Sequence, residues 1–182
     1  MDIDGTPVIF WRHIYDNNVR DHATLRLDGK SGAMRVSEDD WQIDACPHHG
    51  GAISIGGEGA YHVAWFTNAP QRKGLFYARS TDRGKTFSTP RPFGDHHAQA
   101  GHPHVLAQAG NVFIVWKEFD GQRAAVYGMI SQNQGSSWSK PVRMADSAGA
   151  SDHPLLIGDG ERAFLSWNTA REGWRLIDVT IP

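Results

Sequence analysis

The sequence lacks the marks of several protein classes. It has one cysteine, Cys46, so no disulfide can form within the chain. The formal net charge is −2, and no basic block or acidic tail provides the electrostatic footprint of nucleic-acid binding. No apolar run approaches the length of a membrane span. No stretch keeps a helical period, so the expected fold class is all-β.

Tryptophan, in contrast, recurs at a nearly fixed interval. The short apolar runs VIFW, YHVAW, VFIVW and RAFLSW end at Trp11, Trp65, Trp116 and Trp167, which are 54, 51 and 51 residues apart. Further strand-like runs lie before and after most of these, with turn signals between them. A four-stranded antiparallel unit that repeats about every fifty residues is typical of a β-propeller blade. A β-sandwich is the alternative all-β fold, but it does not require this period.

The repeat predicts a single partial β-propeller domain over residues 1–182, with about three and a half blades. The predicted blades are 7–43, which lacks an inner strand, 47–95, 98–145, and 151–181, which lacks an outer strand. A closed ring usually needs at least four blades. We therefore expect missing N-terminal blades or another chain to close the ring. Two copies of this chain would not close the ring simply, because the incomplete first and last blades do not combine into one four-stranded blade.

Two polar turns share one pattern. The turn STDRGKTF contains Ser80, Asp82, Gly84, Thr86 and Phe87. The turn SQNQGSSW keeps Ser131, Gly135 and an aromatic residue, Trp138, but has Asn133 in place of the Asp and Ser137 in place of the Thr. The first turn resembles the Asp box, Ser-x-Asp-x-Gly-x-Thr-Trp, of the sialidase-like (neuraminidase, or BNR-repeat) propellers, with phenylalanine in place of tryptophan. As a repeat architecture, the resemblance covers nearly the whole chain.

The residue types of these turns predict a structural role. Asp and Asn side chains accept hydrogen bonds from nearby backbone N–H groups and close a tight turn. Glycine supplies a backbone conformation that other residues resist, and the aromatic side chain can be buried beneath the turn. A calcium loop would need more oxygen ligands. In the family this turn lies on the face away from the active site, so the resemblance implies no chemistry here.

The family's propellers bind ligands on the opposite face, near the axis, where the chain enters the inner strands. The corresponding segments CPHHGGA, AGHPHV and SDHPLL place His49, His102 and His153 at equivalent positions, so we expect them to share one basin. Three hypotheses remain open. His-Pro could be a structural device that starts a blade. The histidines could line a pocket for a sugar or an anion. They could also hold zinc or copper.

The loops after the tryptophan runs supply the other candidates. Ligand-binding arginines would be Arg12, Arg123 and Arg171. Sialidases use a Tyr nucleophile assisted by a Glu, and Tyr15 and Glu118 are the residues to test for these roles. The family's first clamp arginine and its Asp acid belong to early blades that this sequence does not contain. None of the candidates matches a specific family motif, so catalytic residues stay unassigned and enzymatic activity stays open.

The resemblance implies a glycan-recognising propeller or an exo-glycosidase of the sialidase type. The alternative is a non-catalytic binding or assembly propeller, with or without a metal ion held by the histidines. No cofactor is expected to be required, and the expected ligand is a carbohydrate or an anionic small molecule. Family members are commonly periplasmic or secreted, but the start MDIDGTPVIFW shows no signal peptide, so the localisation is open.

Overall fold

The strands form four antiparallel sheets in which neighbours in sequence pair side by side. The computed structural model describes residues 1–179. The first sheet contains β1 (Val8–Arg12), β2 (His22–Arg26) and β3 (Met34–Arg35). The second contains β4 (Ala52–Ile55), β5 (Tyr61–Ala69), β6 (Arg72–Ser80) and β7 (Arg91–Phe93). The third contains β8 (Gly101–Gln108), β9 (Asn111–Phe119), β10 (Ala124–Ser131) and β11 (Val142–Ser147). The fourth contains β12 (Leu155–Gly158), β13 (Ala163–Thr169) and β14 (Gly173–Asp178).

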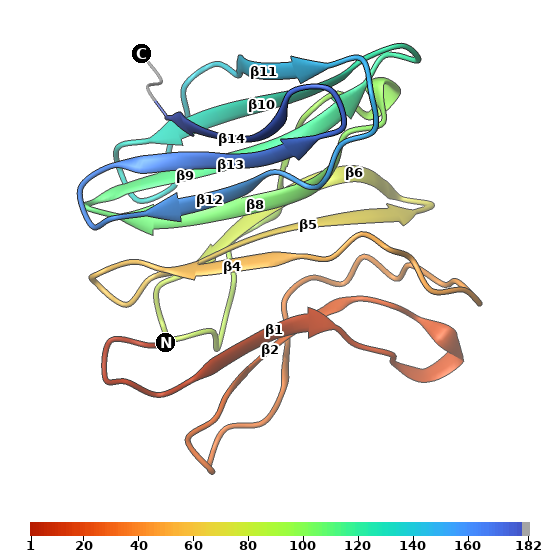
Figure 1. The fold of residues 1–182 in the computed structure, drawn as a ribbon. Helices are drawn as coiled ribbons and strands as arrows, with labels where there is room; N and C mark the ends of the chain where they lie inside the picture. Colours follow the sequence, from red (N-terminus) through yellow and green to blue (C-terminus); the bar gives the residue numbers. More distant parts are fainter. Residues whose placement is uncertain (180–182) are drawn as a thin grey trace.

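The first three sheets follow one another in chain order, from β1–β2 through β4–β6 to β8–β11 (Figure 1), and β12 of the fourth sheet contacts β8 and β9 of the third. Two short 3-10 helices, η1 (Asp16–Asn18) and η2 (His96–Ala98), lie in connections. Strand β11 reaches Ser147, two residues past the predicted unit boundary at 145, because Ala124 pairs with Ser147. The last two residues of the predicted unit 151–181 lie outside the described residues.

The core lies between the sheets, in three hydrophobic clusters. Trp65, Trp116 and Trp167 are each at most 1% exposed, whereas Trp11 is half-buried. A buried indole N–H needs an acceptor, and each of the three has one. Trp65 donates to Asp39 Oδ2 at 2.7 Å, Trp116 to Glu118 at 2.7 Å, and Trp167 to the Asp152 carbonyl at 2.9 Å.

The two polar turns make the same hydrogen bonds. The Ser80 hydroxyl accepts from Gly84 N and the Ser131 hydroxyl from Gly135 N, both at 2.8 Å. Asp82 Oδ1 accepts from the backbone N of residue 86 at 2.9 Å, and Asn133 Oδ1 accepts from that of residue 137 at 2.8 Å. These bonds close the connections between β6 and β7 and between β10 and β11.

The glycines fit these turns because both have φ of +79°. A Cβ added at Gly135 would overlap the Tyr77 hydroxyl of the preceding sheet. The aromatic residues Phe87 and Trp138 pack, partly buried, against two of the core clusters. Each turn therefore holds an outer strand and brings backbone into close packing with buried tyrosines.

The fourth sheet presents an apolar face to solvent. Leu155, Ile157, Trp174 and Leu176 are 49%, 48%, 64% and 48% exposed. Cross-strand pairing places them on the same side of the sheet as Phe164 and its alternate neighbours in β13. The equivalent position in β9 is Phe113, 51 residues earlier, which is buried against the fourth sheet. The exposed face thus repeats a surface that is buried one sheet earlier.

Candidate functional site

The three inner-strand histidines form a stacked column. The ring centroids of His49 and His102 are 4.6 Å apart, with an interplanar angle of 18°. Those of His102 and His153 are 3.5 Å apart at 17°. On its other side, His49 stacks on Phe66 of β5 at 4.3 Å and 23°. His49 and His153 lie in the segments that lead into the second and fourth sheets, and His102 lies at the start of β8 in the third sheet, so the column connects three sheets.

Unusual backbone at the start of β8 positions this column. His102 has φ of +53° and lies in a bulge, where the pairing with β9 shifts between Gly101 and His104. Gln99 also has φ of +53°. Left-handed backbone is costly for non-glycine residues and often occurs at functional sites. At Gly101 a Cβ would come within 3.0 Å of His49 Cε1, so glycine makes room for the imidazole.

The imidazoles of the column are held neutral. Burial, together with the neighbouring His153, His49 and Lys117, lowers the pKa of His102 to about 3. Burial likewise lowers the pKa values of His49 and His153. Because two positive charges in ring contact would repel each other, the stacked arrangement favours neutral rings. Three uncharged aromatic faces therefore lie in one row near neutral pH.

The stacking does not suit the predicted zinc or copper site. The lone pairs of an imidazole lie in the ring plane, so rings that are nearly parallel and in face contact do not direct their nitrogens to one point. Within residues 1–179, no group of three or more His, Cys, Asp or Glu side chains is arranged to hold a metal ion. The geometry of His49, His102 and His153 gives the metal hypothesis no support.

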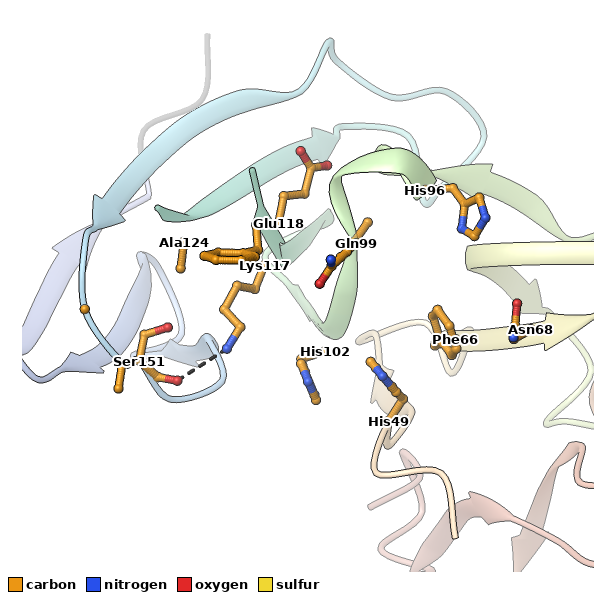
Figure 2. A pocket seen from close by; sticks show the side chains of 14 residues that line it. His49, Phe66, Asn68, His96, Gln99, His102, Lys117, Glu118, Ala124 and Ser151 are labelled. Atoms are coloured by element: carbon orange, nitrogen blue, oxygen red, sulfur yellow. Dashed lines mark hydrogen bonds between the residues drawn. The ribbon is translucent and has the colours of Figure 1, made fainter. Parts of the chain in front are cut away.

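A pocket of about 680 Å³ lies beside the column (Figure 2). His49 and His102 form part of its wall. Four of the other lining side chains offer an aromatic ring, two amides and an amine, and these are Phe66, Asn68, Gln99 and Lys117. Pockets that bind small molecules typically combine apolar walls with a few well-placed polar groups, and this pocket has that composition.

Lys117 provides the amine. It lies in β9 between Gly101 on β8 and Val126 on β10. Its Nζ donates to the carbonyl of Ser151 at 3.3 Å, which Figure 2 shows at the edge of the pocket. Burial lowers the pKa of Lys117, and the charge of Asp152 partly opposes this effect.

The two residues considered for catalysis lie in different places. Glu118 lines the pocket, and its Oε1 accepts from Trp116 Nε1 at 2.7 Å and from the backbone N of Asp95 at 2.9 Å. Tyr15 lies in a separate pocket, where the Arg35 guanidinium is 4.8 Å from its ring centroid. Burial raises the pKa of Tyr15. The structure therefore does not bring Tyr15 and Glu118 together as a nucleophile and its assisting carboxylate.

The candidate arginines do not line the main pocket. Arg12 donates from Nη1 to the Arg20 carbonyl at 3.0 Å, and from Nη2 to the carbonyls of His49 at 2.9 Å and Phe66 at 2.8 Å. Burial lowers its pKa to about 10. Arg12 thus binds backbone of its own chain, contrary to the role of a ligand clamp. Arg123 pairs with Asp146 at 2.8 Å, and Arg171 is exposed.

Four residues that line the pocket were not predicted from the sequence, and these are Phe66, Asn68, Gln99 and Lys117. A sequence signal exists for two of them, Phe66 and Lys117. Each directly follows a periodic tryptophan, and the residues at this position lie in or beside the site. These residues are Arg12, Phe66, Lys117 and Asn168. Asn168 donates to Asp152 Oδ2 at 3.2 Å, next to the histidine column. No comparable sequence signal marks Gln99, since its place depends on left-handed backbone.

Comparisons with known proteins agree with this architecture at the level of the fold. No known family model matches the chain, and no curated protein matches it in sequence. Solved structures do match. A protein of unknown function from Dyadobacter fermentans aligns with a TM-score of 0.63 at 15% identity, over 95% of this chain and 49% of that one. A Hadza microbial sialidase aligns with a TM-score of 0.60 at 16% identity, over 88% and 38%. The α-L-arabinanase of Penicillium chrysogenum, complexed with arabinobiose, aligns with a TM-score of 0.58 at 13% identity, over 81% and 53%.

This chain has a β-propeller glycosidase-like fold. The propeller fold expected from the tryptophan period is thereby confirmed, whereas the number of blades and the Asp-box repeat stay predictions. The chain spans 38–53% of the length of the three solved structures. Over the described part of this propeller chain, no helix is both long and apolar enough to cross a membrane.

Proposed function

We propose that this propeller recognises a carbohydrate in the pocket beside the histidine column. The observation that carries the proposal is the stacked pair of His49 and Phe66, which gives the pocket an aromatic wall next to the amides of Asn68 and Gln99. An aromatic face can pack against the C–H groups of a sugar ring while amides hydrogen-bond its hydroxyls. The likeness of the fold to a sialidase and to an arabinanase solved with arabinobiose supports this ligand class.

The pocket favours recognition over hydrolysis. Most glycoside hydrolases place two carboxylates on either side of the scissile bond, and sialidases replace one of them with a tyrosine. Among the described residues that line this pocket, Glu118 is the only carboxylate, and one of its oxygens already accepts two hydrogen bonds. Tyr15 lines another pocket. The non-catalytic alternative is therefore the one that we adopt for this chain.

The exposed apolar face of the fourth sheet indicates a protein partner. Leu155, Ile157, Trp174 and Leu176 present a broad apolar surface, which soluble proteins normally cover. We propose that further blades or another chain cover it. Such a partner would also extend the propeller beyond the part described here.

The experiment is a calorimetric titration with arabinobiose and, separately, with N-acetylneuraminic acid. Phe66→Ala should weaken the binding of the recognised sugar by about tenfold, because it removes the aromatic wall at a cost near 1.4 kcal/mol. Trp174→Ala removes an aromatic residue from the exposed sheet face and serves as the control. Absence of binding for both sugars, or equal weakening by both variants, would contradict the proposal. Release of a free sugar from an aryl glycoside would favour the glycosidase alternative.

A further inference from the structure

The pocket contains an amine that lacks a carboxylate partner. No Asp or Glu oxygen of the described residues lies within ion-pair distance of Lys117 Nζ, although the other positions of this chain form several Arg–carboxylate pairs. The Lys117 Nζ donates to the Ser151 carbonyl at 3.3 Å, which is a long hydrogen bond. A single neutral acceptor stabilises an ammonium group much less than a carboxylate does.

Burial favours the uncharged form of the Lys117 amine, and the charge of Asp152 opposes it only in part. Lys117 lines the same pocket as His49 and His102 (Figure 2). On the neighbouring strands it is flanked by Gly101, which has no side chain, and by the apolar Val126. An amine in such an environment keeps its lone pair available at a lower pH than an exposed lysine does.

We propose that Lys117 is a nucleophilic amine that forms an imine with small aldehydes or ketones entering the pocket. The Nζ lone pair attacks the carbonyl carbon, one N–H proton passes to the carbonyl oxygen, and a carbinolamine forms. The nitrogen then loses its second proton, the hydroxyl takes up a proton and leaves as water, and the C=N bond forms. One water is released for each imine, and no oxidant, reductant or other co-reactant is needed. Solvent water can carry both protons from nitrogen to oxygen.

The pocket volume suits this class of compound. About 680 Å³ is enough for a small hydroxy-aldehyde or the open-chain form of a sugar, and the amides of Asn68 and Gln99 can bind hydroxyls next to the carbonyl. Imine formation differs from recognition of a sugar ring, because the ligand must carry a reactive carbonyl group. It does not depend on the proposed glycan binding.

The test is reductive trapping with glycolaldehyde at pH 7, with sodium cyanoborohydride as the reductant and peptide mass spectrometry as the readout. The chain has five lysines, which are Lys30, Lys73, Lys85, Lys117 and Lys140. At limiting reagent, the peptide that contains Lys117 should gain the reduced adduct before the other four. Lys117→Arg keeps the positive charge but should abolish this early adduct. Lys140→Arg, at an exposed lysine, should leave it unchanged.

Two results would overturn the proposal. One is modification of Lys117 at the same rate as Lys140 or more slowly. The other is an early adduct that persists in the Lys117→Arg variant. Circular dichroism of Lys117→Arg establishes that the variant is folded. Because glycolaldehyde lacks a sugar ring, this result is separate from the titrations with arabinobiose and N-acetylneuraminic acid, and either proposal can fail alone.

Discussion

The imidazole ring centroids of His102 and His153 lie 3.5 Å apart, face to face, although His102 is in β8 of the third sheet and His153 precedes β12 of the fourth. This contact is favourable while both imidazoles are neutral. It therefore makes packing between the third and fourth sheets sensitive to protonation.

Acid should weaken the fold through His102. Its pKa is lowered from an ordinary value of 6.5 to about 3 in the folded chain, so below pH 6.5 the unfolded chain binds a proton that the folded chain does not. The stabilising contribution of the neutral ring is present above pH 6.5 and is lost as the pH falls from 6.5 towards 3. Urea unfolding between pH 7 and pH 4 measures this dependence.

The variant His102→Gln should reduce the slope of the free energy of unfolding against pH in that range. The variant His97→Gln, at an exposed histidine outside the column, is the control and should keep the original slope. An unchanged slope in His102→Gln would show that other groups cause the acid sensitivity.

Gly135→Ala should destabilise the chain by about 2 kcal/mol or more, because the new methyl group would overlap the Tyr77 hydroxyl and the backbone has φ of +79°. Gly121→Ala is the matched control. Gly121 also has positive φ, +96°, but has nothing within 4 Å of the added Cβ, so the cost should be about 1 kcal/mol. Urea denaturation gives both values. Equal losses would mean that the turn can move away from Tyr77 freely.

Arg12→Lys distinguishes a structural arginine from a ligand clamp. Lysine cannot reach the three carbonyls that the planar guanidinium contacts, so buried acceptors lose their partners. The expected loss of stability is about 2 kcal/mol, since each buried unsatisfied polar group costs about 1–3 kcal/mol. Thermal unfolding measures it, with the exposed Arg171→Lys as the control. A variant of full stability that bound sugar poorly would instead identify Arg12 as a clamp.

The sequence predicts the sheets well because the repeat is long and regular. Trp65, Trp116 and Trp167 keep a 51-residue interval, and each fills the same space between sheets. The alignment of the His-Pro segments likewise placed His49, His102 and His153 together, because equivalent starts of inner strands converge. Both predictions rest on local sequence patterns that the fold repeats.

The residues that line the pocket could not be predicted from a repeated sequence pattern. Its amine is a single residue in a strand whose neighbours are apolar, and Lys117 has no sequence mark beyond its place after Trp116. Gln99 faces the pocket because of its left-handed backbone, which no residue pattern here predicts. The sequence favoured a ligand-clamp role for Arg12 because its real partners are distant in the chain. Arg12 binds the backbone carbonyls of Arg20, His49 and Phe66, up to 54 positions away, and a sequence pattern does not reveal such contacts.

The uncovered side of the β12–β14 sheet has a consequence for how the chain unfolds. In a repetitive fold, each unit is stabilised mainly by its nearest neighbours. The middle sheets have a packed neighbour on both sides, whereas the fourth sheet packs on one side and leaves Trp174 64% exposed. Amide hydrogens of β13 and β14 should therefore exchange before those of β5 and β9, so that opening starts at this end and proceeds inwards sheet by sheet.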